Sequence, residues 1–370
     1  MWERAAHDQL VFYLSTKQRL STQQYGNKKW NSTETALIQT TDSILQNIDK
    51  KELTAAVLLD MSKAFDSIDH DILITKLRDP GLSCSSIEWF KSYLSLRYQV
   101  VKIQASISDQ LPVTSGVPQG SILGPLLFSI YTNDLPLVPK HCSTQSYVDD
   151  TKLLLNFRLK DQQNIVSKMN EDLQRICQWT FTNKLLLNPD KTKFVISGSR
   201  PLVSKVEGLH LSLLGKELTP AKSAKDLGII LDSNLTYDDH VTKTVSTCMS
   251  RLGQINRVKH VLDKDTLTIV VNCLVFSKLF YCSNVWSNTT ESNLDKVQKV
   301  QNFACRIVSG VRKFDHITPV LRAMQWLPIR QLLHYRNAVM AFNCVTGCAL
   351  ASLTDQFIKR SDFSTRTTRN

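Results

Sequence analysis

The spacing of apolar and polar residues divides the chain near residue 235. Before this point, segments with apolar residues at helical spacing alternate with short apolar runs that are typical of β-strands. After it, helical spacing prevails, so the pattern predicts an α+β region followed by a mainly helical region. The predicted helices span residues 33–50, 69–78, 85–96, 126–133, 161–184, 239–260, 264–280, 292–309 and 328–346. The predicted strands span residues 54–60, 99–107 and 226–232, and residues 185–196 are predicted to be a turn that opens into a strand.

Aspartates lie at the ends of two predicted strand segments. Residues 54–60 form a near-continuous apolar run that ends in Asp60, which predicts a strand buried on both faces. Asp149 and Asp150 lie between two short apolar runs, a pattern that predicts a β-hairpin with an Asp-Asp turn at its tip. Adjacent aspartates can bind hard divalent cations such as Mg²⁺, but aspartate is also a favoured turn residue for structural reasons.

A glycine-rich segment precedes one of the predicted helices. Residues 115–125 contain three glycines and two prolines directly before the apolar helix 126–133. Glycines allow a backbone to approach a ligand closely, and a helix start offers free N–H groups to an anion. The segment is therefore either part of a binding site or an ordinary loop and helix cap.

The composition of the 370-residue chain is that of a soluble globular protein, with 42% hydrophobic and 21% charged residues. No apolar run approaches the roughly 18 residues that a membrane-spanning helix needs, and the mixed, polar residues 1–8 do not have the pattern of a secretory signal. Nine scattered cysteines argue against a disulfide framework. These features predict an intracellular protein with reduced cysteines and no membrane partner.

Positive charge is concentrated in the last third of the chain. Residues 241–370 carry 18 Lys and Arg against 7 Asp and Glu, a net charge of +11, whereas residues 1–240 carry 27 against 26. The basic residues are dispersed through predicted helices, which favours a folded basic surface over a disordered arm. Such a surface suits a polyanion, with nucleic acid first in line, and a basic surface with no partner is the alternative.

The order of these features resembles the motifs of reverse transcriptases of non-LTR (LINE-type, jockey-like) retrotransposons. The similarity is close over residues 3–232 and looser in the remainder of the chain. The matching segments are residues 24–26 and 32–37 in the fingers, residues 58–70, 115–125, 147–150 and 187–192 as the first to fourth palm motifs, and residues 227–232 at the position of the primer grip.

The resemblance implies a right-hand polymerase fold that catalyses RNA-directed DNA synthesis. Fingers and an antiparallel palm sheet would occupy residues 1–232, and a helical, basic thumb and C-terminal region would occupy residues 233–370. The partners would be an RNA template, a DNA primer and dNTPs, and the nucleus would be the site of action. Asp60, Asp149 and Asp150 would hold two Mg²⁺ ions that catalyse an in-line displacement at phosphorus.

The resemblance also assigns roles to residues around the aspartates. Lys191 would donate a proton to the departing pyrophosphate, or merely pair with Asp190. Phe65 matches the steric gate that excludes a 2′-hydroxyl, or is a plain core residue. Asp66 and Asp69 fit helix-start or surface positions better than metal ligands. The other substrate-binding residues that it implies are Gln119 and Gly120 at the incoming nucleotide and template base, Tyr147 beside the primer terminus, and Lys28 in the fingers.

The fingers segment departs from the family pattern. Residues 27–30 contain Lys28 where the family usually has arginine, which keeps the charge but loses a bidentate phosphate contact. The chain also begins inside the fingers, without an endonuclease domain before them, which suggests a fragment or a decayed copy of an element. The alternative function is an inactive, truncated remnant that only binds nucleic acid. An intron-encoded splicing factor is a second rival, and an RNA-templated RNA polymerase is disfavoured by Phe65.

Overall fold

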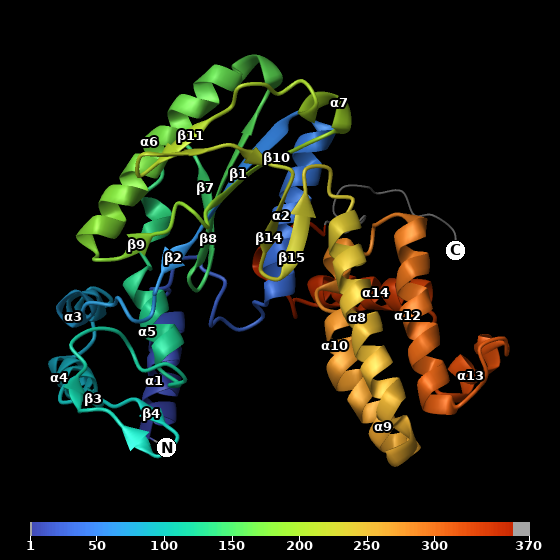
Figure 1. Ribbon diagram of the computed structural model, residues 1–370. Helices are drawn as coiled ribbons and strands as arrows, with labels where there is room; N and C mark the ends of the chain where they lie inside the picture. The colour runs from blue at the N-terminus through green and yellow to red at the C-terminus, as the bar shows by residue number, and fades with distance from the viewer. Residues whose placement is uncertain (1, 358–370) are drawn as a thin grey trace. The chain divides into compact units, whose positions relative to one another are not determined.

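The computed structural model describes residues 2–357, and these form two compact units (Figure 1). The first unit contains the chain up to residue 29 together with residues 47–221, and the second contains residues 30–46 and the chain from residue 222 onward. Helix α2 (Thr33–Asp49) therefore belongs to the second unit over most of its length. The assignment of residues 1–232 to fingers and palm stays a prediction.

A five-stranded sheet forms the centre of the first unit (Figure 1). Its strands, in spatial order, are β13 (Pro220–Ala221), β10 (Lys193–Ser197), β1 (Leu53–Leu59), β8 (Asp150–Phe157) and β7 (Ser143–Tyr147). β1 is antiparallel to both of its neighbours and β8 is antiparallel to β7, whereas the short β13 is parallel to β10. Every residue of β1 except Leu58 is buried, as its apolar sequence predicts.

Helix α6 (Gln162–Thr182) packs into the core of the first unit through one apolar stripe (Figure 1). The stripe consists of residues at helical spacing that are almost completely buried, namely Ile165, Met169, Leu173 and Ile176. Burial of each such side chain contributes about 1.5–3 kcal/mol. The other helices of this unit are α1 (Trp2–Thr16), α3 (His70–Arg78), α4 (Cys84–Leu94), α5 (Gly124–Tyr131) and α7 (Arg200–Val203).

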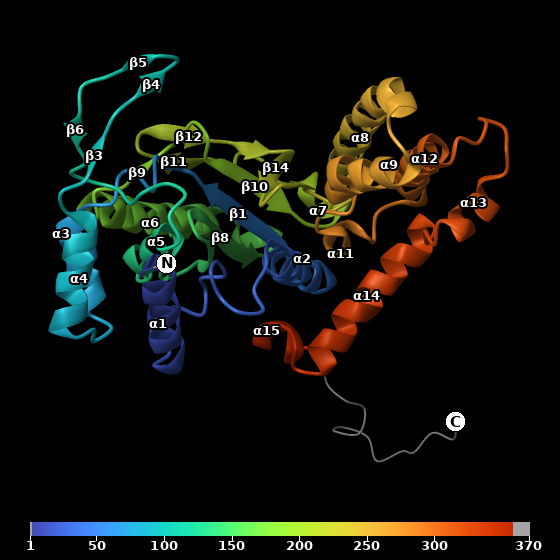
Figure 2. The ribbon, with the colours of Figure 1, turned by 90° about the horizontal axis from the view of Figure 1, so that it is seen from below.

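Two short strand pairs form an extension of the first unit (Figure 2). The sequence predicts one strand over residues 99–107, and this prediction is wrong because the chain reverses after Ile103, where Gln104 has a positive φ of 53°. The extension contains β3 (Tyr98–Gln99) paired with β6 (Leu111–Pro112), and β4 (Lys102–Ile103) paired with β5 (Ser106–Ile107). The remaining elements are β2 (Met61–Ser62) with β9 (Leu186–Leu187), β11 (Leu211–Leu213) with β12 (Lys216–Leu218), and 3-10 turns at Leu135–Leu137 and Leu159–Asp161.

The second unit is mainly helical, as the spacing of its apolar residues predicts (Figure 2). A π-helical turn interrupts the helix predicted over residues 264–280. The elements are α8 (Asp238–Val258), a 3-10 turn (Lys259–Val261), α9 (Lys264–Val271), the π-helical turn (Asn272–Phe276), α10 (Ser277–Leu279), α11 (Ser283–Trp286), α12 (Glu291–Ser309), α13 (Ile317–Ala323), α14 (Ile329–Val345) and α15 (Ala351–Thr354). None of the helices in the described part of the chain combines the length and the apolarity that a bilayer crossing demands.

The second unit also contains a hairpin where the sequence predicts a single strand over residues 226–232. Its strands are β14 (Ser223–Asp226) and β15 (Ile229–Asp232). The turn residues Leu227 and Gly228 have φ values of 43° and 91°. A two-residue hairpin turn of this kind needs positive φ at both positions, and glycine adopts it without strain. The Tyr281 hydroxyl donates to the Leu227 carbonyl at 2.9 Å and so holds the turn.

Candidate active site

The β7–β8 hairpin carries Asp149 and Asp150 at its tip. Tyr147 pairs with Asp150, so the two turn residues are Val148 and Asp149, and Asp150 is the first residue of β8. The predicted Asp149–Asp150 turn is therefore wrong by one residue, because the strand ladder extends to Asp150. Val148 has a left-handed φ of 58°, which a β-branched residue adopts only under strain.

Asp60 follows β1 at the end of the ladder where β8 begins with Asp150. The last pair of the β1–β8 ladder joins Leu59 and Thr151, so Asp60 directly follows, and Asp150 directly precedes, the residues paired at this end of the ladder. The fold thus brings Asp60, Asp149 and Asp150 to one end of the sheet.

The donor set at this end of the sheet suits a hard divalent cation. Three carboxylates offer only oxygen ligands, which Mg²⁺ and similar cations prefer. Within residues 2–357, no group of three or more His, Cys, Asp or Glu side chains is arranged to hold a metal ion. Metal binding by Asp60, Asp149 and Asp150 therefore stays a prediction, and it is supported by their chemistry and by the strand register.

The loop after β9 places Lys191 beside Asp60. The Asn188 side-chain oxygen accepts from the amides of Asp190 and Lys191 at 3.0 and 3.2 Å, which closes the loop. Lys191 Nζ lies 4.0 Å from Asp60 Oδ2. Asp190 instead pairs with Lys216, whose ammonium lowers the pKa of that carboxyl. Asp190 and Lys191 thus have different partners, Lys216 and Asp60, and the role of Lys191 as a proton donor stays a prediction.

The same loop is bonded to the backbone of Asp60. The amide of Asn188 donates to the Asp60 carbonyl at 2.8 Å. The amide of Asp60 donates to Thr192 Oγ1 at 3.4 Å, and this hydroxyl donates to the Asn188 carbonyl at 2.8 Å. Asn188 and Thr192 thus hold the carboxylate-bearing residue, a role that sequence reasoning missed. The polar residues on either side of Asp190-Lys191 were the signal that could have shown it.

Phe65 lies between α5 and the glycine-rich loop. Its half-buried ring packs on Phe128 with a centroid distance of 4.9 Å, and its carbonyl accepts from the Val117 amide at 3.0 Å. The Gly116 amide donates to the Ile68 carbonyl at 2.7 Å. The first and second palm motifs are therefore joined by backbone hydrogen bonds around Phe65.

Gln119 and Gly120 are exposed in the glycine-rich loop. Gln119 Nε2 donates to Asp66 Oδ1 at 2.8 Å, so the side chain lies over the residue that follows Phe65. Asp69 is the N-cap of α3, and its pKa is lowered by a hydrogen bond from Lys184. Asp66 and Asp69 thus have partners away from the three aspartates, in agreement with their predicted structural roles.

Lys28 and Tyr147 are the remaining predicted site residues. The Lys28 ammonium donates to the Ser21 carbonyl, and partial burial lowers the pKa of this lysine. Its positive charge is therefore engaged within its own loop. Tyr147 is the half-buried last residue of β7, directly before the turn.

Alanine at Gly116 is expected to destabilise the fold more than alanine at Gly120. Both glycines have positive φ values, 82° and 81°, so both substitutions carry a backbone penalty of about 1 kcal/mol. A Cβ on Gly116 would lie 2.8 Å from Asp66 Cα, whereas nothing lies within 4 Å of one on Gly120. This overlap should lower the free energy of unfolding of the Gly116→Ala variant by about 1–3 kcal/mol more than that of the Gly120→Ala variant. Urea unfolding of both variants measures this, and equal losses would contradict the prediction.

Comparison with known proteins gives matches over most of the chain. A family model described as reverse transcriptase (RNA-dependent DNA polymerase) matches residues 3–231. A probable RNA-directed DNA polymerase from transposon BS of Drosophila melanogaster is 31% identical over 323 residues, which cover 84% of this chain and 35% of that protein. The RNA-directed DNA polymerase from mobile element jockey of Drosophila funebris is 26% identical over 297 residues, which cover 78% and 32%.

These relatives are longer than the chain, which spans about a third of their length. Among solved structures, apo telomerase from Candida tropicalis is 12% identical with a TM-score of 0.46, and the match covers 83% of this chain and 50% of that chain. A structural likeness at this level supports no conclusion.

Proposed function

The chain belongs to the reverse transcriptase (RNA-dependent DNA polymerase) family, and on this premise we propose that it extends a DNA primer with dNTPs on an RNA template. The relatives confirm the sequence-based assignment to the reverse transcriptases of non-LTR retrotransposons. The mainly antiparallel sheet with flanking helices is consistent with the right-hand polymerase fold of this family. The observation that carries the proposal is the position of Asp60, Asp149 and Asp150 at one end of the central sheet.

The proposed reaction joins the primer 3′-oxygen to the α-phosphorus of a dNTP and releases pyrophosphate. Two divalent cations held by Asp60, Asp149 and Asp150 would activate the 3′-oxygen and stabilise charge on the departing pyrophosphate. We propose Mg²⁺ for both because an all-oxygen donor set suits it. Lys191, whose ammonium lies 4.0 Å from Asp60, would donate the proton that the pyrophosphate takes up.

Phe65 would select deoxynucleotides from beneath the sugar. The ring contacts Phe128, and the Phe65 carbonyl bonds the Val117 amide, so the residue is supported by both a side-chain and a backbone contact. A ring supported in this way would resist displacement by a 2′-hydroxyl. Gln119 and Gly120 are exposed in the adjoining loop and would contact the incoming nucleotide and the template base.

The parts of the chain around this centre would hold the nucleic acid. Tyr147 precedes the turn with Asp149 and would pack beside the primer terminus. Lys28 would contact a phosphate only after leaving its bond to Ser21. Residues 1–232 would act as fingers and palm, and residues 233–370 as a thumb and C-terminal region. The basic thumb would bind phosphates with an affinity that falls as salt rises, and the site of action would be nuclear DNA.

Primer extension on poly(rA) annealed to oligo(dT), with dTTP and Mg²⁺, tests the proposal. Incorporation is expected, and it should stop when EDTA removes divalent cations and resume when Mg²⁺ is restored. Absence of incorporation together with salt-dependent binding of the same duplex would favour the alternative function, an inactive remnant that only binds nucleic acid.

A further inference from the structure

Residues 23–25, a short segment before Gly26, lie beside the edge strand β7. Gln24 and Ser146 form a parallel bridge. The Ser146 amide donates to the Gln23 carbonyl at 2.9 Å, and the Tyr25 amide donates to the Ser146 carbonyl at 2.8 Å. β7 is the last strand in the sheet order, so this segment bonds backbone groups on its outer edge. The segment is thereby fixed next to the turn that follows β7.

The Gln24 side chain bonds to both backbone groups of Val148. Its Oε1 accepts from the Val148 amide at 2.9 Å, and its Nε2 donates to the Val148 carbonyl at 3.4 Å. The same Oε1 accepts from the Gly26 amide at 3.0 Å. Gln24 is only 2% exposed. Its bond to the Gly26 amide is buried, where hydrogen bonds are electrostatically stronger, and its two bonds to Val148 are partly buried. One side chain thus connects the backbones of two segments far apart in the sequence.

Gly26 contacts the same turn directly. A Cβ at this position would lie 2.5 Å from Val148 Cγ2 and 3.0 Å from the Val148 amide nitrogen. Such distances are well below van der Waals contact, so no larger residue fits without moving the turn. Val148 is held at a φ of 58°, and a strained conformation of this kind persists only where its surroundings fix it. Gln24 and Gly26 supply those surroundings.

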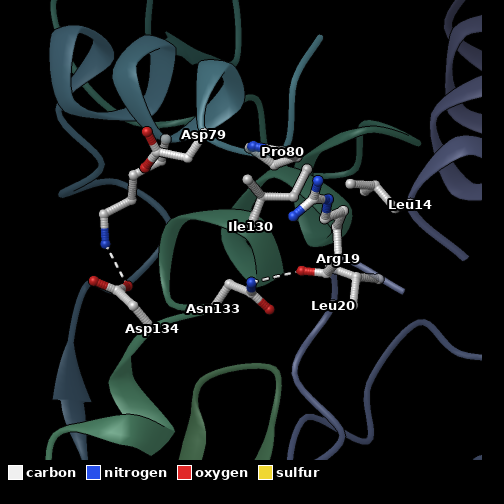
Figure 3. A pocket seen from close by; sticks show the side chains of 9 residues that line it. Leu14, Arg19, Leu20, Asp79, Pro80, Ile130, Asn133 and Asp134 are labelled. Atoms are coloured by element: carbon white, nitrogen blue, oxygen red, sulfur yellow. Dashed lines mark hydrogen bonds and ion pairs between the residues drawn. The ribbon is translucent and has the colours of Figure 1, made fainter. Parts of the chain in front are cut away.

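The segment that carries Gln24 is itself held in place by Asn133 (Figure 3). The Asn133 side chain donates to the Arg19 carbonyl at 2.8 Å and accepts from the Ser21 amide at 2.7 Å. These bonds fix the chain three residues before Gln24. The Val148–Asp149 turn is therefore connected to the rest of the first unit in two ways, through β8 and through the segment that Asn133 holds.

We propose that Gln24 and Gly26 are positioning residues that hold the Val148–Asp149 turn in the conformation that presents the Asp149 carboxylate to divalent cations. This inference rests on the proposed function, because it assigns a metal-binding role to Asp149. It adds two residues from the N-terminal segment to a site otherwise built from the sheet and the loop after β9.

Two variants and one matched control test the inference. Gln24→Met keeps the length of the side chain and removes its three hydrogen bonds, and Gly26→Ala adds the single atom that overlaps Val148. The control is Gln23→Met at the neighbouring position. Within residues 2–357, Gln23 Oε1 is buried and has no hydrogen-bond partner. Replacing this side chain therefore removes no bond from Oε1 to the Val148–Asp149 turn.

Two measurements on the full chain report on the turn without requiring polymerase turnover. Hydrogen exchange of a peptide covering residues 143–151 should speed up by about tenfold in Gln24→Met and Gly26→Ala, because the Val148 amide loses its acceptor or is displaced. Mn²⁺ titration followed by electron paramagnetic resonance should show about tenfold weaker binding at the site that Asp149→Ala abolishes. Gln23→Met should match the wild type in both measurements. If primer extension occurs, the Mn²⁺ concentration that gives half-maximal extension should be higher in Gln24→Met and Gly26→Ala than in the wild type. The KM for dTTP should stay within about twofold of the wild-type value.

Unchanged exchange or unchanged Mn²⁺ affinity in Gln24→Met would overturn the inference. Equal changes in Gln23→Met would also overturn it, because they would show general loosening of the segment. Failure of the proposed function is distinguishable, since it is the absence of primer extension by the wild type, whereas this inference is decided by exchange and Mn²⁺ affinity of the variants.

Discussion

Replacing Asp149 with alanine is expected to reduce primer extension by at least about 1000-fold without unfolding the protein. Loss of a metal ligand removes several kcal/mol of transition-state stabilisation, and each 1.36 kcal/mol corresponds to a tenfold change in rate. Asp149 is half-buried in a turn and is not among the residues with positive φ, so alanine can adopt its backbone conformation. Removal of one of three neighbouring negative charges should leave Tm unchanged or slightly raised.

The matched control for this substitution is Asp161→Ala. Asp161 ends the 3-10 turn before α6, is exposed, and makes no side-chain capping bond to that helix. Its replacement should leave incorporation of labelled dTTP on poly(rA)/oligo(dT) unchanged. Binding of the same duplex and thermal unfolding are measured for both variants. An Asp149→Ala protein as active as the wild type would remove this residue from the catalytic site.

Most helices and the central strands could be predicted from the sequence because their apolar periods are long and regular. The stripe of α6 has the period of a helix, and the apolar run of β1 has the length of a buried strand. The aspartates could be predicted because Asp60 ends a buried strand and Asp149-Asp150 interrupts two apolar runs. These patterns lie within single segments of the chain.

The errors arose where the chain reverses at residues that do not by themselves favour a turn, alone at Gln104 and beside a single glycine at Leu227. Gln104 and Leu227 adopt positive φ at reversals, although neither residue type favours it, so residues 99–107 and 226–232 each seemed one strand by spacing alone. The Val148–Asp149 turn has the same origin, since its register is set by pairing of β7 with β8. Local periodicity contains no information on which residue of an alternating run occupies the turn.

Contacts between distant segments could not be predicted from local patterns, and only the resemblance implied that Asp60 and Asp149 share a site. The Thr33 and Glu34 side chains belong to a segment that resembles the fingers, yet they bond to Tyr281 and to the Asn284 amide, at 3.0 Å each. The part of α2 before residue 47 therefore lies in the second unit. Such bonds depend on tertiary packing between segments some 250 residues apart, which no local pattern records.

Phe65→Val is expected to raise the use of UTP relative to dUTP by about 10- to 100-fold. These nucleotides pair with the same template base and differ only in the 2′-hydroxyl, so their kcat/KM ratio isolates the contact with the sugar. Forcing a group into a filled space costs about 1–3 kcal/mol, and removal of the ring relieves that cost for the ribonucleotide alone. The ratio is measured on poly(rA)/oligo(dT).

Phe65→Tyr is the control, because it keeps the bulk of the ring and should keep the wild-type ratio. A plain core role for Phe65 predicts a different result for Phe65→Val. The contact with Phe128 would be weakened, the free energy of unfolding would fall, and incorporation of both nucleotides would decline together. An unchanged ratio accompanied by such a loss would refute the gate. A raised ratio at near-normal dUTP incorporation would show that the half-buried ring faces the sugar of the incoming nucleotide.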